Sequence, residues 1–368
     1  MDQPDRDSPP SQVAALPVPL VWSADCVRHE PLAEIWVGVR TPGTEVAERA
    51  TTIKAAVLAA GARLVQATVH DDSTVDRVHD RSLLEHLRTI YDAWTASGLP
   101  VDPGADRVVP YLFPTQGLLG GLEMREPVAA QARAGRYCYD TMTLVGPGTW
   151  EAARGALDAA LTAVDLLGRH EARVAYALCR PPGHHAGRDS FGGSCYLNNA
   201  AVAAEGLLAA GHARVAVVDI DAHHGNGTQS LFYDRGEVFY GSVHVDPGAG
   251  WFPHYVGFAD ERGAGAGIGT NRNEPLAPGT GDQGWLAALD RLAGGVAHFG
   301  ATALVVSLGV DAAALDAESP LLVSADGYHE AGLTLGALGL PTVAVQEGGY
   351  HLDTLGELVV ATLSGLSG

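Results

Sequence analysis

Short apolar runs alternate along this chain with longer stretches that are rich in alanine and leucine. Four of the runs are apolar or β-branched at both odd and even positions, as expected for parallel strands covered on both faces. They occupy residues 174–178, 215–221, 303–308 and 342–346. Helix-like stretches lie among them at 150–168, 199–210 and 285–299. This alternation predicts an α/β fold around a central, mostly parallel sheet.

Two segments lack this alternation of strand-like and helix-like stretches. Residues 1–18 are rich in proline, aspartate and serine, which predicts a flexible tail. Residues from about 95 to 127 carry many glycines and prolines and little periodicity, which favours a lid or an interface element. A tolerated surface insertion is the alternative for this long loop. Since no repeat or linker divides the rest, residues 19–368 are expected to form a single catalytic domain.

Composition narrows the class of protein. Apolar residues make up 46% of the chain, enough for a large core. The formal net charge of −20 argues against nucleic-acid binding and favours cationic partners, although solubility alone would also explain it. The four cysteines form no CxxC pair. No apolar run approaches the roughly 20 residues of a membrane span, and a secretory signal pattern is missing, so we expect a cytoplasmic protein without membrane contact.

Polar residues follow the ends of the predicted strands. The first strand leads to His184 and His185, the second to residues 219–226, the third to Asp311 and the fourth to Tyr350. In open parallel sheets, ligands bind beyond the carboxyl ends of the strands. The convergence of histidine, aspartate and tyrosine on one edge therefore predicts a catalytic site there.

A metal site is expected within this group. Asp219, Asp221 and His223 alternate with a period of two and share one face. Beyond the strand end, Asp221 and His223 can reach one cation, and Asp311 from another strand supplies a third ligand. Three mixed nitrogen and oxygen ligands with an open position are typical of catalytic zinc, and Fe²⁺ or Co²⁺ would also fit. Taken alone, the Asp-x-His segment could simply cap a strand end.

The adjacent His184 and His185 fit general acid–base catalysis, because hydrolysis of an amide needs a proton acceptor for water and a donor for the leaving amine. Asp219 and Asn226 are their natural partners. The carboxylate should raise the pKa of one imidazole, and the amide should leave the other near its reference value. An isolated histidine pair could equally be surface or core residues. Tyr350, after two glycines, could stabilise an oxyanion, although Gly-Gly-Tyr by itself is often only a turn.

Five segments together resemble the zinc-dependent histone deacetylase family: RPPGHHA at 180–186, GGSCYLNN at 192–199, DIDAHHGNGT at 219–228, LGVD at 308–311 and EGGY at 347–350. Within that family the chain is most similar to the bacterial acetylpolyamine amidohydrolases, through PGTWEAA at 147–153, FPH at 252–254, GAGAG at 263–267 and the long segment before residue 127. The resemblance implies a three-layer arginase/deacetylase-type α/β fold.

The resemblance also implies roles for individual residues. Asp221, His223 and Asp311 match the zinc ligands, and His184 and His185 match the tandem catalytic histidines. The remaining matches are Asp219 and Asn226 as the partners of those histidines, Tyr350 as the carbonyl-polarising tyrosine, Phe252 as one aromatic wall of the substrate tunnel, and Gly193 as the residue whose carbonyl accepts the substrate amide hydrogen.

The family commonly binds structural potassium ions near the active site. The inner ion matches oxygens of Asp219, Asp221, His223, Ser242 and Val243, and the outer one matches Phe232, Arg235, Val238 and Thr270. In the polyamine branch the long insertion narrows the entrance across a homodimer, so the resemblance also implies a homodimer here.

Two positions depart from the family pattern. Ser194 stands where a second aromatic tunnel wall is usual, which removes an apolar clamp and widens the channel. Gln131 aligns with an acidic residue that would meet the distant ammonium of a polyamine, and a neutral amide loses that charge-assisted contact.

The sequence therefore predicts a metal-dependent deacetylase that cleaves an N-acetyl group from a small acylated amine such as an acetylpolyamine. A protein-lysine deacetylase and a deacylase of a bulkier N-acyl metabolite are the alternatives, and the serine at 194 favours the second of these. A non-catalytic relative that only binds acylated ligands is the third, but such relatives typically lose a metal ligand or the tyrosine, and this chain retains all of them.

Overall fold

The computed structural model describes residues 16–99 and 107–368. Its centre is an eight-stranded sheet with the order β4-β1-β5-β10-β9-β6-β7-β8, in which every neighbouring pair is parallel. The strands are β1 (Leu20–Trp22), β4 (Leu64–Gln66), β5 (Val174–Ala177), β6 (Val215–Asp219), β7 (Val238–Val245), β8 (Asn271–Leu276), β9 (Ala303–Leu308) and β10 (Thr342–Gln346).

Burial follows the position of each strand in the sheet. Every residue of β5, β6, β7, β9 and β10 is buried, as expected for strands covered on both faces. The edge strand β8 carries charged residues and Pro275, and β4 at the other edge is partly exposed. Charge and proline on edge strands discourage pairing with another sheet edge.

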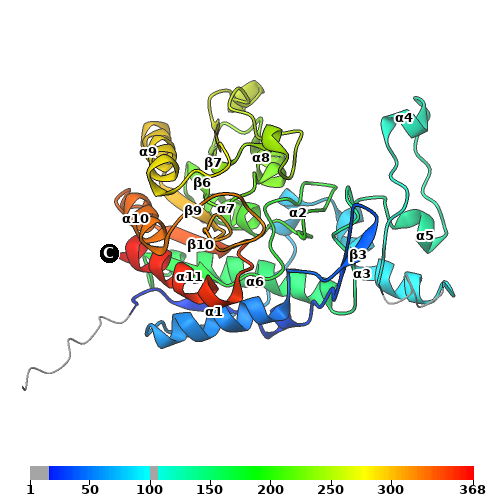
Figure 1. Ribbon diagram of the computed structural model, residues 1–368, viewed down its shortest axis with the longest axis horizontal. Helices are drawn as coiled ribbons and strands as arrows, with labels where there is room; N and C mark the ends of the chain where they lie inside the picture. The colour runs from blue at the N-terminus through cyan, green and yellow to red at the C-terminus, as the bar shows by residue number, and fades with distance from the viewer. Residues whose placement is uncertain (1–15, 100–106) are drawn as a thin grey trace, which may run out of the picture.

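Helices cover the sheet (Figure 1). The long α6 (Thr149–Gly168) packs on α7 (Asn199–Ala209) and on the central strands. A second row packs in series, from α9 (Asp282–Phe299) through α10 (Ala325–Gly336) and α11 (Leu352–Ser367) to α1 (Ala47–Ala59). The shorter helices are α2 (Val75–Val78), α3 (Arg81–Thr95), α4 (Gln116–Leu119), α5 (Ala130–Arg133) and α8 (Asn226–Phe232), with 3-10 turns η1 (Ala24–Val27), η3 (Pro247–Ala249) and η4 (Gly265–Gly267).

The buried apolar side chains of the sheet and its helices form one continuous core. Outside it, β2 (Glu34–Trp36) and β3 (Val39–Thr41) form an antiparallel hairpin. None of the helices in the described ranges is both long and apolar enough to cross a bilayer.

The α/β prediction is confirmed, with a parallel eight-stranded sheet and surrounding helices. The four predicted strands correspond to β5, β6, β9 and β10, and the three predicted helices to α6, α7 and α9. The predicted end of β6 was wrong by two residues: the strand ends at Asp219, and of the next two residues only Ile220 still donates a backbone hydrogen bond to β9.

Two predicted boundaries also need correction. The tail was expected to run to residue 18, but Leu16 and Val18 are buried in the core, since both are apolar and pack beside β1. Residues 1–15 of that predicted tail lie outside the described residues. The long loop was expected to begin at Thr95, but Thr95 ends α3. The described part of the loop is irregular apart from α4, and its residues 100–106 are not among those described.

Candidate active site

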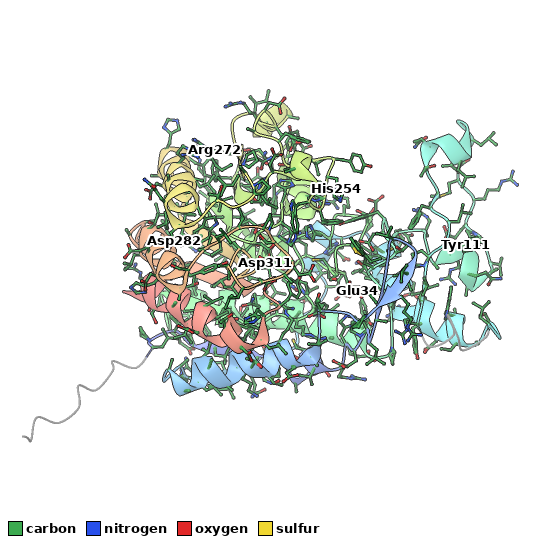
Figure 2. The ribbon with its side chains drawn as sticks, in the orientation of Figure 1. Glu34, Tyr111, His254, Arg272, Asp282 and Asp311 are labelled. Carbon is green, nitrogen blue, oxygen red and sulfur yellow. The ribbon has the colours of Figure 1, made fainter. Side chains whose placement is uncertain are left out.

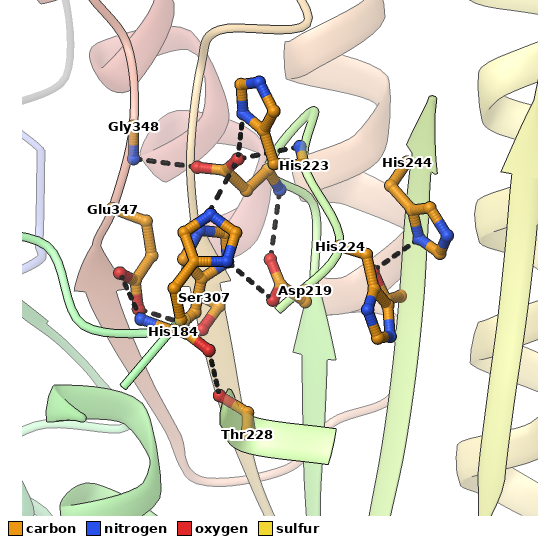
Figure 3. Close-up of polar contacts among 12 residues, drawn as sticks. His184, Asp219, His223, His224, Thr228, His244, Ser307, Glu347 and Gly348 are labelled. Carbon is orange, nitrogen blue, oxygen red and sulfur yellow. Dashed lines mark hydrogen bonds and ion pairs between the residues drawn. The ribbon is translucent and has the colours of Figure 1, made fainter. Parts of the chain in front are cut away.

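The predicted site residues come from the ends of adjacent strands. In the sheet, β5, β10, β9 and β6 are consecutive, so the segments that follow them meet at one place. His184 and His185 follow β5, residues 219–223 end and follow β6, Asp311 follows β9, and Tyr350 follows β10. In Figure 3, His184 lies between Glu347 and Asp219, and the His223 ring lies at the top of the view.

Asp221, His223 and Asp311 form a compact group, with both aspartates buried and His223 partly buried, whose candidate ligand atoms all lie within 4.8 Å of one another. The His223 Nδ1 atom is 3.3 Å from Asp221 Oδ1 and 3.1 Å from Asp311 Oδ2. Gly348 makes the close approach of backbone possible, because a Cβ there would lie 2.4 Å from Asp311 Oδ2 and 2.6 Å from Asp221 Oδ2. The Gly348 N–H donates to Asp221 Oδ2 instead.

The two carboxyls of this group have opposite pKa shifts. Burial raises the pKa of Asp311 to about 7, and the charge of Asp221 adds to the effect. Burial also opposes ionisation of Asp221, but His184 and His223 outweigh it and hold the pKa of that carboxyl below its usual range. The two carboxylates also raise the pKa of the His223 imidazole between them, against the effect of burial. Mixed nitrogen and oxygen donors at this spacing fit a divalent ion with an open coordination position.

A second cluster, His184, Cys195 and Glu347, also brings candidate ligand atoms within 4.8 Å of one another. Both carboxylate oxygens of Glu347, however, already accept hydrogen bonds. Its Oε2 atom accepts hydrogen bonds from the backbone N–H groups of Gly183 and His184, and Oε1 accepts one from Ser307. This cluster therefore holds the histidine loop in place.

The tandem histidines have different partners and opposite pKa shifts. His184 Nδ1 lies 3.0 Å from Asp219 Oδ2. Burial lowers the pKa of His184, but Asp221 and Asp219 outweigh it and raise that pKa to about 10. His185 Nδ1 lies 2.7 Å from Asn226 Oδ1. Burial and the neighbouring His184 hold the pKa of His185 well below its usual value, rather than near it as the sequence suggested.

Tyr350 is held by residues that the sequence did not single out. Its backbone N–H donates to Asp316 Oδ2 at 2.6 Å. The guanidinium of buried Arg49 lies 4.6 Å from the centre of the Tyr350 ring and donates to the carbonyls of Gly349 and Glu347. Burial raises the pKa of Tyr350 well above its ordinary value, so the phenol stays protonated and can donate.

A small cavity of about 80 Å³, here called the inner pocket, contains the reactive groups. It is lined by Glu34, Thr44, Met142, His185, Gly193, Ser194, His223, Phe252, Glu318 and Tyr350. Sites for drug-sized ligands measure roughly 300–1,000 Å³, so this pocket fits only a short acyl group. A larger outer cavity of about 620 Å³ shares Met142 and Phe252 with it.

Aromatic side chains form part of the pocket wall. The Phe252 ring lies edge-on to His185, with centroids 4.7 Å apart, and stacks on Tyr139 at 6.3 Å. The Tyr139 hydroxyl donates to the His185 carbonyl at 2.9 Å. The sequence did not single out Tyr139, because it lies 46 residues before His185 and does not follow a predicted strand. Ser194 also lines the pocket, with φ at 62°.

Gly193 lies against His185, and a Cβ at Gly193 would be 2.5 Å from His185 Cδ2. Its backbone N–H donates to Asp140 Oδ2 at 2.6 Å, a contact that the sequence did not suggest. Gln131 is not brought into the site: it lies exposed on α5 and is not among the residues that line the inner pocket or the outer cavity.

The residues matched to potassium lie on neighbouring elements. Ser242 and Val243 belong to β7, and Ser242 pairs in register with Asp219 of β6. Phe232 ends α8 and Val238 begins β7. Thr270 approaches Arg235, with its Oγ1 atom 3.3 Å from the Arg235 carbonyl oxygen.

Comparison with known proteins identifies the class. Over 350 residues the chain is 41% identical to acetylpolyamine amidohydrolase of Mycoplana ramosa, covering 95% of this chain and 99% of the relative. Acetylpolyamine amidohydrolase 1 of Pseudomonas aeruginosa is 40% identical, over 95% and 98% of the two chains. The crystal structure of acetylpolyamine aminohydrolase from Burkholderia pseudomallei superimposes with a TM-score of 0.87 at 39% identity, covering 95% and 98%.

The fold and the site thus define a metal-dependent hydrolase of amide bonds, of the deacetylase type. Residues 44–366 match the histone deacetylase domain. The chain belongs to the histone deacetylase family.

Proposed function

We propose that the protein removes the acetyl group from an acetylated polyamine, with Zn²⁺ held by Asp221, His223 and Asp311. The observation that carries this proposal is the inner pocket of about 80 Å³, in which His185, His223 and Tyr350 all face a space sized for a short acyl group. The polyamine substrate is supported by the names of the relatives that match nearly the whole chain. Fe²⁺ and Co²⁺ accept the same donors as zinc.

When bound, the cation supplies a Lewis acid for the acyl carbonyl and lowers the pKa of a water molecule. The Tyr350 hydroxyl donates to the acyl oxygen as negative charge develops there. His185, whose pKa is held low, is neutral at pH 7 and accepts the proton of the attacking water. Asn226 fixes the orientation of its ring. The proton then passes from histidine to the leaving amine.

Three further expectations about the protein remain predictions. The two potassium ions, the homodimer and the cytoplasmic location rest on resemblance or composition. The register of Asp219 with Ser242 and the approach of Thr270 to Arg235 support the choice of residues for the inner and outer potassium sites.

Replacing the general base tests the chemistry. We expect His185→Ala, with its metal content unchanged, to lower kcat for N-acetylputrescine at least about a hundredfold, because proton transfer by a positioned group contributes roughly 10²–10⁴-fold. The measurement is steady-state kinetics with metal analysis of the same samples. The wild-type protein should prefer acetylputrescine or acetylspermidine to an acetyl-lysine peptide. A near-normal kcat in the variant, or a preference of more than tenfold for the peptide, would contradict the proposal.

One observation favours a second substrate class, a bulkier N-acyl amine: Ser194 leaves one wall of the inner pocket without an aromatic side chain. If that position controls the width, Ser194→Phe should lower kcat/KM for bulky N-acyl amines and leave acetylputrescine almost unaffected. Ser194 already has a φ of 62°, so phenylalanine at this position would adopt the same backbone conformation as a side-chain-bearing residue does now. If the Ser194→Phe variant and the wild-type protein have the same kcat/KM for both substrate types, residues other than 194 set the width of the channel.

A further inference from the structure

A chain of three hydrogen bonds leaves the side chain of His185 and returns to the backbone of the same residue. His185 Nδ1 lies 2.7 Å from Asn226 Oδ1. The Asn226 Nδ2 group donates to the hydroxyl oxygen of Tyr139 at 3.4 Å, and the Tyr139 hydroxyl donates to the His185 carbonyl at 2.9 Å. The proposed chemistry uses His185 and Asn226, whereas Tyr139 has no part in it.

The direction of each bond follows from the protons that each group can give. The His185 carbonyl can only accept, so the single phenol proton of Tyr139 goes to it and the phenol oxygen is left to accept. The amide of Asn226 must therefore present its NH₂ group to Tyr139 and its oxygen to His185. Because that oxygen accepts from Nδ1, the proton of the neutral imidazole lies on Nδ1 and Nε2 carries none. Burial raises the pKa of Tyr139 well above its ordinary value, so the phenol keeps the proton that it donates.

The reversed amide would have the opposite effect on the ring. If Asn226 were turned about, its NH₂ group would donate to Nδ1 of His185 and the ring proton would lie on Nε2. An Nε2 atom that carries a proton cannot accept one from water. In residues 16–99 and 107–368, Nε2 of His185 forms no hydrogen bond, so among them the partner of Nδ1 alone decides the tautomer.

The Tyr139 ring is held by parts of the fold other than the two residues that it orients. Its backbone N–H donates to the Phe191 carbonyl at 3.1 Å. The ring packs on Gly192, where an added Cβ would lie 2.3 Å from it. The same ring stacks on Phe252, with centroids 6.3 Å apart. In Figure 2 the segment that carries Phe252 is labelled at His254, in the upper half of the view.

We propose that Tyr139 is a positioning residue for the deacetylation: through the amide of Asn226 it fixes His185 in the tautomer whose Nε2 atom is free to accept a proton. The inference rests on the proposed function and extends it. An amide alone does not decide which of its two ends faces the imidazole. A carboxylate would need no such help, because both of its oxygens accept. The asparagine at 226 therefore creates the need for the tyrosine.

Replacing Tyr139 by phenylalanine removes only the hydroxyl. We expect Tyr139→Phe to lower kcat for N-acetylputrescine roughly tenfold, because a typical hydrogen bond contributes up to about that factor. KM should stay within about twofold, since a general base acts only in the transition state. Tyr233→Phe is the control: Tyr233 caps the other end of α8, and its hydroxyl makes no hydrogen bond within the described ranges. Metal content and unfolding temperature are measured for every protein.

A second background separates orientation of the amide from other roles of the hydroxyl. In Asn226→Asp, the same Tyr139→Phe change should lower kcat less than about twofold, since the carboxylate accepts from Nδ1 in either orientation. A loss that came from packing or from contact with substrate would be similar in both backgrounds. An equal loss in the two backgrounds, or a rise in KM without a fall in kcat, would overturn the proposal.

The tautomer is also measured without turnover, by ¹⁵N NMR of protein labelled in its histidine rings. We expect His185, recognised by the signals that His185→Ala lacks, to carry its proton on Nδ1 in the wild type and to populate both tautomers in Tyr139→Phe. An unchanged tautomer in that variant would overturn the proposal even where kcat falls. If the wild-type protein does not hydrolyse N-acetylputrescine, the proposed function fails, whereas the spectra still decide whether Tyr139 fixes the ring.

Discussion

The two adjacent histidines show how a neighbouring side chain decides the chemistry of a residue. Both are buried, which by itself lowers an imidazole pKa. Asp219 and Asp221 reverse the effect for His184, whereas the neutral Asn226 leaves His185 with a depressed pKa. The pair is thus divided into a protonated member and a neutral member at pH 7. The neutral member is the one that faces the inner pocket.

Glu34 provides a pH-dependent test at this scale. Its folded pKa of about 7 lies above its ordinary value of 4.5, so the folded protein binds more protons between these two values. The free energy of unfolding should therefore fall as pH rises from 4.5 to 7 and stay reduced above 7. Glu34→Gln removes this loss, so its unfolding temperature should exceed that of the wild type at pH 8.

The advantage should shrink as the pH is lowered to 4.5, where the glutamate is largely protonated. Calorimetric scans across pH 4.5–8.5 measure it, and Glu357→Gln, at an exposed position on α11, should show no such trend. An advantage that is the same at both ends of this range would mean that the glutamate carries no raised pKa.

At the scale of elements, the segment after β10 depends on glycine at 348. An added methyl group there would collide with the carboxylates of Asp311 and Asp221, the proposed metal ligands, at 2.4 and 2.6 Å. We expect Gly348→Ala to fold but to lose most of its bound metal and its activity. Metal analysis after gel filtration measures the loss. Gly294→Ala in α9 is the matched control, because nothing lies within 4 Å of its added Cβ, and it should keep full metal content.

Full metal occupancy in Gly348→Ala would show that the carboxylates can move aside without penalty. The contrast with Gly294 also separates the packing effect from the general effect of replacing glycine, which in a helix is stabilising by roughly 0.5–1 kcal/mol.

Elements differed in how well the sequence predicted them. The strands β5, β6, β9 and β10 were predictable because strands buried on both faces are apolar throughout. The three-residue β1 and β4 and the polar edge strand β8 give no such signal. The candidate metal ligands and the histidine pair were predicted because they follow predicted strands. Glu34, Glu318 and Asp316 were not, since a single acidic residue in a loop or hairpin indicates nothing until distant segments are brought together.

At the scale of the whole molecule, the proposed metal ligands come from distant parts of the chain, since Asp221 and His223 follow β6 and Asp311 follows β9. A cation that binds only the folded state stabilises it, by about 2.7 kcal/mol at a free concentration one hundred times Kd. Chelation should therefore lower the unfolding temperature by several degrees, and added Zn²⁺ should restore it. An unfolding temperature that is indifferent to verified metal removal would contradict a site formed by folding.

The sheet and the segments outside it contribute different residues to the inner pocket. The reactive groups are anchored at the ends of consecutive inner strands, where any displacement disturbs the core. The β2–β3 hairpin and the loop between β9 and α10, by contrast, supply the lining residues Glu34 and Glu318 from outside the sheet. Exchange of those two segments should alter selectivity without disturbing hydrolysis, which makes them the natural place for an ancestral deacetylase to acquire new substrates and for a protein engineer to do the same.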